Sequence, residues 1–134
     1  MKNAIMAGVI AGFASGILMF ILGISGLFEI FSEFPAQFPV SVQTLAIAYT
    51  IWFVISGIIW GAFYAFFYDY IPSKGVRKSL IYGIIIWIIT PIHAAGAASM
   101  YGMYMWAIPF AIATFFSTGI VYGIVLGHLY RPSK

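Results

Sequence analysis

The sequence predicts an all-α integral membrane protein, a four-helix bundle of two tandem transmembrane hairpins that form a single domain over residues 1–134. Three observations lead to this fold class. Of the residues, 63% are hydrophobic and only 7% are charged, whereas soluble domains carry about 25% charged residues. Four apolar stretches are long enough to cross a bilayer, which takes about 20 helical residues. All the Lys and Arg residues fall on one side of the resulting topology.

The first predicted helix covers residues 4–28. Its apolar run is longer than the roughly 7–15 residues of a secretory signal core, and no A-x-A cleavage site follows it, so we expect the helix to remain in the protein. Gly8, Gly12 and Gly16 recur every four residues along it. This spacing gives the helix a face without side chains, along which another helix backbone can approach.

The second predicted helix covers residues 44–68 and has Gly57 and Gly61 at the same four-residue spacing. The loop that precedes it contains Glu29 and Glu33 but no Lys or Arg. Because basic residues resist translocation, we expect this loop on the outer side of the membrane.

The third predicted helix covers residues 79–100, and the fourth covers residues 106–128. Gly119, Gly123 and Gly127 lie on the fourth helix, again four residues apart. The glycine faces are interpreted as internal contacts of the bundle; the alternative is that one of them faces another subunit.

The second and fourth helices end in similar sequences, "GIIWGAFYAFFYDYIPSK" from Gly57 and "GIVYGIVLGHLYRPSK" from Gly119. The first and third helices show a weaker match, in which Gly8 aligns with Gly83. Both hairpins start on the same side, so a duplication would give parallel repeats related by an axis along the membrane normal. Chance similarity between two glycine-rich apolar helices is the alternative.

The basic residues set the orientation of the chain. They are Lys2, Lys74, Arg77, Lys78, Arg131 and Lys134. The sequence therefore predicts a multi-pass protein of the cell membrane with both termini in the cytoplasm. Tyr68, Tyr82 and Tyr130 are expected in the head-group region on the same side. The net charge of +3 is interpreted as a topology signal that meets anionic lipid, with no nucleic acid as a partner.

One ionisable side chain, His93, lies inside the third helix, in "ITPIHAAGAASM". Its polar groups must be satisfied within the protein at that depth. Thr90 shares its helical face, and Thr50 and Thr114 are expected at similar depths, so these four residues form the candidate functional polar site. The structural interpretation is a neutral histidine hydrogen-bonded between helices; contact with a proton, a solute or a metal is the functional one.

The sequence contains no recognisable catalytic constellation. Glu29 and Glu33 are predicted on the outer side and Asp69 on the inner side, so Asp69 cannot pair with either glutamate. Ser-His-Asp sets, H-E-x-x-H, Walker and Rossmann motifs are missing. We therefore expect no enzyme and no cofactor. The sequence has no cysteine, so the redox compartment stays undetermined.

These features favour a structural or accessory subunit that packs in the lipid bilayer, within a homo-oligomer or a larger membrane complex. One alternative is a homo-oligomeric channel or carrier for a small solute, which would use the hydroxyls of Thr90, Thr114, Ser117 and Thr118. The other is the handling of copper on the outer side, because thioether and imidazole groups suit Cu(I). That site would combine His93, Met100, Met103 and Met105 with Glu29 and Glu33.

Overall fold

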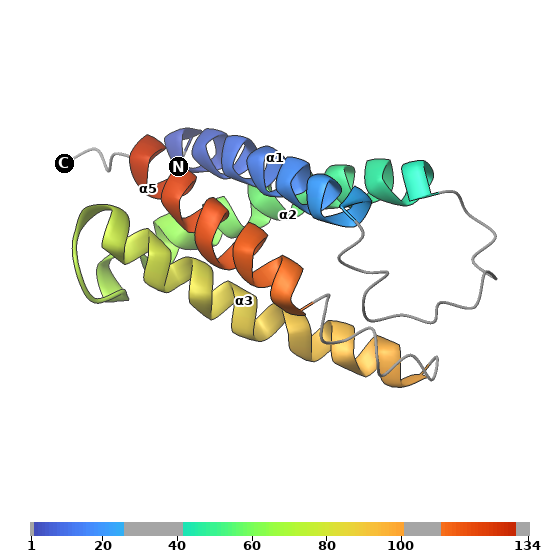
Figure 1. The fold of residues 1–134 in the computed structure, drawn as a ribbon. Helices are drawn as coiled ribbons and strands as arrows, with labels where there is room; N and C mark the ends of the chain where they lie inside the picture. The colour runs from blue at the N-terminus through green and yellow to red at the C-terminus, as the bar shows by residue number, and fades with distance from the viewer. Residues whose placement is uncertain (1, 26–41, 101–110, 131–134) are drawn as a thin grey trace.

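The computed structural model describes residues 2–25, 42–100 and 111–130 (Figure 1). For residues 23–24, 42–46, 49 and 91–100 within its helices it describes the backbone only. All regular elements of the described residues are helical, which confirms the all-α class for this part of the chain. They are α1 (Lys2–Ile24), α2 (Val42–Phe67), the 3-10 turn η1 (Tyr68–Tyr70), α3 (Gly75–Met100), the π-helix η2 (Phe115–Tyr122) and α5 (Gly123–Leu129).

The observed helices lie where the apolar stretches predict them, with different ends. The prediction over 4–28 corresponds to α1, that over 44–68 to α2, and that over 79–100 to α3. The fourth prediction, 106–128, corresponds from residue 111 onward to one continuous helix, 111–129, which we call the last helix. Its first turn is α-helical, its middle is η2, and its end is α5. Residues 106–110 lie outside the described residues.

Within the described part of the chain, three helical segments are long and apolar enough to cross a membrane: Lys2–Leu22, Thr50–Tyr70 and Ala111–Leu129. A turn joins the second of them to α3. In this turn Ser73 has a φ of 92° and Gly75 a φ of 57°. The left-handed conformation costs a glycine little, since it has no Cβ, and α3 starts directly at Gly75.

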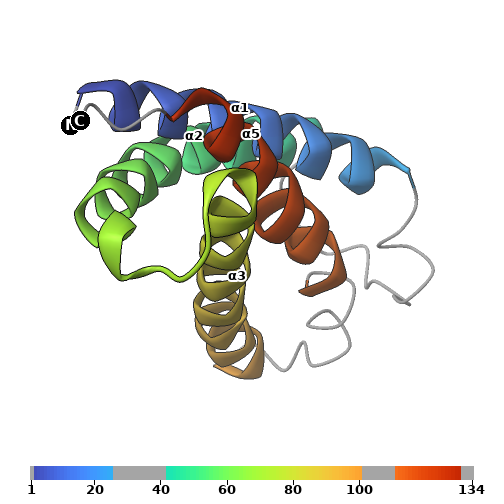
Figure 2. The same ribbon diagram turned by 90° about the vertical axis from the view of Figure 1, so that its left-hand side faces the viewer.

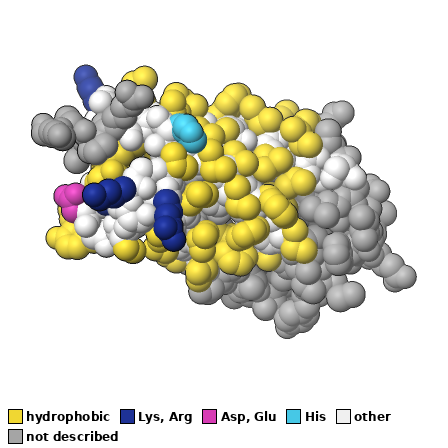
Figure 3. Space-filling model, turned by 60° about the vertical axis from the view of Figure 1, so that its left-hand side comes forward, with side chains coloured by type: hydrophobic (Ala, Val, Ile, Leu, Met, Phe, Trp, Pro, Cys, Tyr) yellow, Lys and Arg dark blue, Asp and Glu magenta, His cyan; other side chains and the backbone are white. Residues whose placement is uncertain are grey.

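The helices pack as two hairpins. Helix α1 lies against α2 along its length, and α3 lies against the last helix; α1 also contacts both η2 and α5, which joins the hairpins (Figures 1 and 2). Helices α2 and α3 meet near Tyr64 and Tyr82 and diverge from there (Figure 1). The described cations gather at one end of the molecule, where α1 begins and α2 is followed by α3, and apolar side chains cover the surface beyond them (Figure 3). We call this end the basic end.

Both hairpins use corresponding glycines for their internal contact. A Cβ placed on Gly83 would lie 2.5 Å from the carbonyl oxygen of Gly119, and a Cβ placed on Gly8 would contact that of Gly57 even more closely. In the alignment of the two hairpins, Gly8 corresponds to Gly83 and Gly57 to Gly119. The same agreement holds one turn away, where a Cβ on Gly61 would lie 2.6 Å from the Ala4 carbonyl oxygen. Position 4 corresponds to Ser79, whose carbonyl oxygen would lie 2.9 Å from a Cβ on Gly123.

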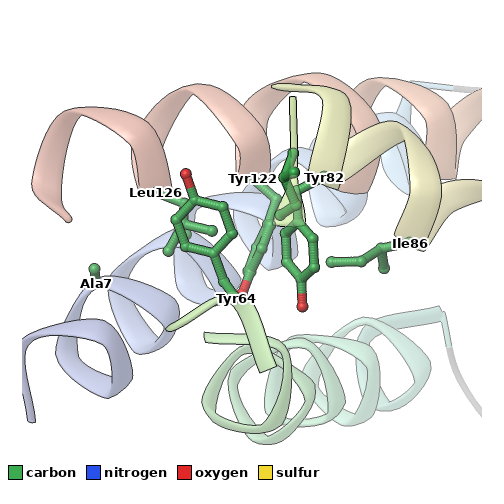
Figure 4. Close-up of a cluster of buried hydrophobic side chains, with 8 residues drawn as sticks. Ala7, Tyr64, Tyr82, Ile86, Tyr122 and Leu126 are labelled. Atoms are coloured by element: carbon green, nitrogen blue, oxygen red, sulfur yellow. The ribbon is translucent and has the colours of Figure 1, made fainter. Parts of the chain in front are cut away.

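Aromatic rings fill the core towards the basic end. The rings of Tyr64 and Tyr82 lie 4.9 Å apart between α2 and α3, and Tyr122 reaches them from the last helix (Figure 4). Ile86 and Leu126 pack at the two sides of these rings (Figure 4). The tyrosines therefore hold together the hairpins at the place where α2 and α3 meet.

Candidate functional site

The residues predicted to surround His93 are found on three different helices. His93 itself lies in α3, where its side chain is outside the described residues. The Thr90 hydroxyl is partly buried and donates to the carbonyl of Ile86 at 2.9 Å. Thr50 faces α1, because its methyl carbon would lie 3.3 Å from a Cβ placed on Gly16.

Thr114 is buried in the last helix, and its hydroxyl donates to the Ala111 carbonyl at 3.1 Å. Thr50 and Thr114 also take part in further interactions. Convergence of the three threonines on His93 stays a prediction, because the histidine side chain is not described.

The structure brings together four of the predicted packing glycines between α1 and α2. A Cβ on Gly57 would lie 3.0 Å from the Cα of Gly12, and a Cβ on Gly8 would lie 2.8 Å from the Cα of Gly61. Real Cβ atoms rarely come this close to a backbone atom. These two helices are therefore in direct backbone contact, a geometry that only glycine permits.

The glycines of the last helix are less uniform. Gly123 and Gly127 face α3, since a Cβ on Gly123 would lie 3.0 Å from the Cα of Leu80 and one on Gly127 would lie 2.9 Å from the Cα of Val76. Gly119 differs, because a Cβ there would meet only the Phe115 ring at 3.4 Å and the Trp87 Cβ at 3.6 Å, which are ordinary contact distances.

Sequence reasoning did not assign Gly83 to a packing contact, although it faces the backbone of the last helix. Its carbonyl neighbours would lie 2.5 Å (Gly119) and 3.1 Å (Thr118) from an added Cβ. The signal was present in the alignment of Gly83 with Gly8. It was missed because Gly83 has no second glycine four residues away on its own helix.

A cluster of buried hydroxyl groups joins α1 to the π-helix. The hydroxyl of Ser15 on α1 lies 2.8 Å from the carbonyl oxygen of Ala11 and 2.9 Å from that of Ser117. Ser15, Thr114, Ser117 and Thr118 are all buried, and we call these four residues the hydroxyl cluster. Three of its members, Thr114, Ser117 and Thr118, are hydroxyls that the channel alternative invokes. The cluster lies where α1 packs against the middle of the last helix.

The π-helix gives the hydroxyl cluster its unusual backbone. A π-helix uses hydrogen bonds from residue i to residue i+5, is rare, and is frequent at functional sites. The start of the last helix is fixed to α3 by the indole of Trp87, which donates to the Ala111 carbonyl at 3.0 Å. Within η2, Ser117, Thr118, Gly119 and Tyr122 are buried. The π-helix η2 therefore combines buried polar side chains with a backbone that is wider than an α-helix.

A second group of polar contacts lies at the basic end, around Tyr68. Lys78 is only 7% exposed; its ammonium donates to the Tyr68 carbonyl at 2.5 Å and lies 3.9 Å from the centre of the Tyr68 ring. Lys78 therefore differs from the other described Lys and Arg residues, which are exposed. Its ammonium satisfies a carbonyl acceptor where α2 is followed by η1, at a helix end that presents unpaired acceptors.

Tyr82 belongs to the buried aromatic cluster. It is buried, and its phenol donates to the Trp60 carbonyl at 2.7 Å, while the phenol of Tyr122 donates to that of Gly57 at 3.3 Å. Tyr130, just beyond the last helix, is partly buried beside Tyr68 and Tyr64. Burial, followed by the nearby Tyr68 and Asp69, raises the pKa of the Tyr130 phenol above its ordinary value.

The residues proposed for copper cannot be placed. Met103, Met105, Glu29 and Glu33 lie outside the described residues, and the side chains of His93 and Met100 are likewise not described. Among the described residues, no group of three or more His, Cys, Asp or Glu side chains could hold a metal ion.

Comparison with curated proteins and with solved structures gives no match for this chain. The model of one protein family, described as a family of unknown function (DUF6789), matches residues 1–133. Since the match extends over nearly the whole sequence and hence over both hairpins, the chain belongs to the DUF6789 family.

Proposed function

We propose that this chain is a non-enzymatic, multi-pass protein of the cell membrane that acts as a structural or accessory subunit by packing against other protein in the bilayer. In this proposal α1, α2, α3 and the last helix cross the membrane as a four-helix bundle with both termini in the cytoplasm. The position of the exposed cations Lys2, Lys74 and Arg77 at the basic end supports this orientation, because basic residues remain on the cytoplasmic side.

The observation that carries the proposal is the open surface of α2. Only 17% of the apolar segment of α2 is buried, compared with 39% for α1 and 44% for the last helix. Its exposed side chains are large and apolar: Ile51, Trp52, Ile55, Ile59, Phe63 and Phe66. Helix α2 is held by α1 on one side and touches α3 only near Tyr64. It therefore has a larger free surface than α1 or the last helix for a further transmembrane helix, either from a second copy or from another subunit.

Photo-crosslinking in native membranes tests the proposal. A photoreactive amino acid replaces Ile59 on α2, which is 50% exposed, or Phe13 on α1, which is 51% exposed and serves as the matched control. An accessory subunit should give a discrete protein adduct from position 59 and little from position 13. An adduct at twice the chain mass would identify a homo-oligomer, and a larger one a separate subunit. If both positions give only lipid adducts, the chain does not work by packing through α2.

The hydroxyl cluster favours a second candidate, a homo-oligomeric channel or carrier for a small solute. Buried Ser and Thr hydroxyls on a π-helix, with Thr118 and Ser117 next to each other, could line a polar path through an apolar protein. Flux of small neutral and charged solutes into proteoliposomes measures this activity directly. Ser117→Ala should change the flux if the path runs along the hydroxyl cluster, and Ser25→Ala, an exposed hydroxyl near the end of α1, should not.

A further inference from the structure

The hydroxyl of Thr118 differs from most of the buried or partly buried helix hydroxyls that the structure describes. Five of these donate to a carbonyl three or four residues earlier in their own helix: Ser15 to Ala11, Ser79 to Val76, Thr90 to Ile86, Thr114 to Ala111 and Ser117 to Thr114. This is the usual way in which a helix satisfies such a group. Thr118 is 6% exposed, and its Oγ1 has no hydrogen-bond partner among the described residues.

The π-helix explains why Thr118 lacks the usual acceptor. Hydrogen bonds to residue i+5 widen the backbone, so the carbonyl four residues earlier is not where an α-helix would place it. That carbonyl belongs to Thr114, and it already lies 3.4 Å from the hydroxyl of Ser117. This distance is long for a bond between two oxygen atoms. The geometry around the Thr114 carbonyl is therefore poor for both neighbouring hydroxyls.

The residue before Thr118 also shares a single donor with another carbonyl. The Ser15 hydroxyl carries a single proton, yet it lies within bonding distance of two carbonyl oxygens, those of Ala11 and Ser117. It can satisfy only one of them fully at a time. A polar group that is buried without a partner is destabilising, and in a membrane-spanning segment it cannot reach bulk water.

We propose that the Thr118 hydroxyl binds a single internal water molecule in the middle of the last helix. Water is the smallest group that both donates and accepts, and buried water molecules in proteins typically bind polar groups that would otherwise be unsatisfied. The inference does not depend on the accessory role proposed above.

The direct test is the contact between water protons and the Thr118 methyl group in the wild-type protein, measured by NMR cross-relaxation in nanodiscs. The Thr114 methyl is the internal control, since Thr114 is buried on the same helix but has a protein acceptor at 3.1 Å. We expect a water contact at Thr118 and none at Thr114. The absence of a contact at Thr118 would overturn the proposal.

Substitution provides an independent measurement. Thr118→Val removes the hydroxyl at nearly constant volume, whereas Thr118→Ser keeps it. With a bound water, the melting temperature should fall in Thr118→Val, and Thr118→Ser should retain the water contact and remain closer to the wild type. If the hydroxyl is instead dry and unpartnered, Thr118→Val should melt at or above the wild-type temperature, and the water site is then refuted.

Discussion

Gly57→Ala and Gly119→Ala alter corresponding positions of the two hairpins, but the structure predicts opposite effects on stability. A Cβ on Gly57 would overlap the Gly8 carbonyl oxygen and lie 3.0 Å from the Cα of Gly12, so α1 and α2 would have to separate. The required shift is roughly 1 Å if atoms are to regain ordinary contact distances. Overpacking of this kind costs about 1–3 kcal/mol. A Cβ on Gly119 would meet nothing closer than 3.4 Å.

Replacing glycine by alanine also favours a helix by about 1 kcal/mol. Because this gain applies to both variants, it cancels in the comparison. Gly119→Ala should therefore be more stable than Gly57→Ala by about 1–3 kcal/mol, the overpacking cost alone. Reversible unfolding in mixed micelles, followed by circular dichroism, measures the difference. Gly8→Ala is the positive control, since its Cβ would contact Gly57. Equal stability of Gly57→Ala and Gly119→Ala would refute the argument from backbone contact.

Three further predictions concern single residues. Lys78→Met should lower the free energy of unfolding by about 1–3 kcal/mol, because it removes a charged hydrogen bond and a cation–π contact. Lys74→Met, at an exposed position, should leave the free energy of unfolding unchanged, and equal losses in the same unfolding assay would argue against a role for the buried ammonium. Ser15→Ala should cost about 0.6–2 kcal/mol as the bond to Ser117 between helices is lost, and a thermal melt indistinguishable from that of Ser25→Ala would contradict this. A cysteine at Gln37 should react with an impermeant thiol reagent added to whole cells and one at Ser73 should not, since Ser73 lies at the basic end; the reverse pattern would invert the proposed orientation.

The helices could be predicted because they follow from the apolar composition of the sequence. Long apolar stretches without charge have few alternatives to a helix in a bilayer, and α1, α2 and α3 occupy them. The exact ends could not be predicted, since they depend on local turns. The start of α3 at Gly75, for example, follows from the positive φ of that residue. The π-helix gave no sequence signal, because its hydrogen-bond register depends on how the last helix fits against α1 and α3.

The candidate site could be predicted less well, because burial is a property of the assembled helices. Lys78 and Tyr82 have side chains typical of a membrane interface, and only the meeting of α2 with α3 buries them. Thr118 was one of several hydroxyls on an apolar helix. Unlike Thr114, Thr118 has a hydroxyl oxygen without a hydrogen-bond partner among the described residues. This difference depends on the local backbone and could not be derived from residue type. His93 remains a sequence-based candidate.

The glycine contacts within each hairpin have a consequence for biogenesis. Gly8 and Gly57 meet inside the first hairpin, and Gly83 and Gly119 meet inside the second, so neither backbone contact requires residues of the other half. The first hairpin can therefore close while the ribosome is still translating α3. The tyrosine contacts between α2, α3 and the last helix need residues of both hairpins. If the chain inserts as the proposed topology requires, two halves that each close on their own glycine contacts would dock through these tyrosines.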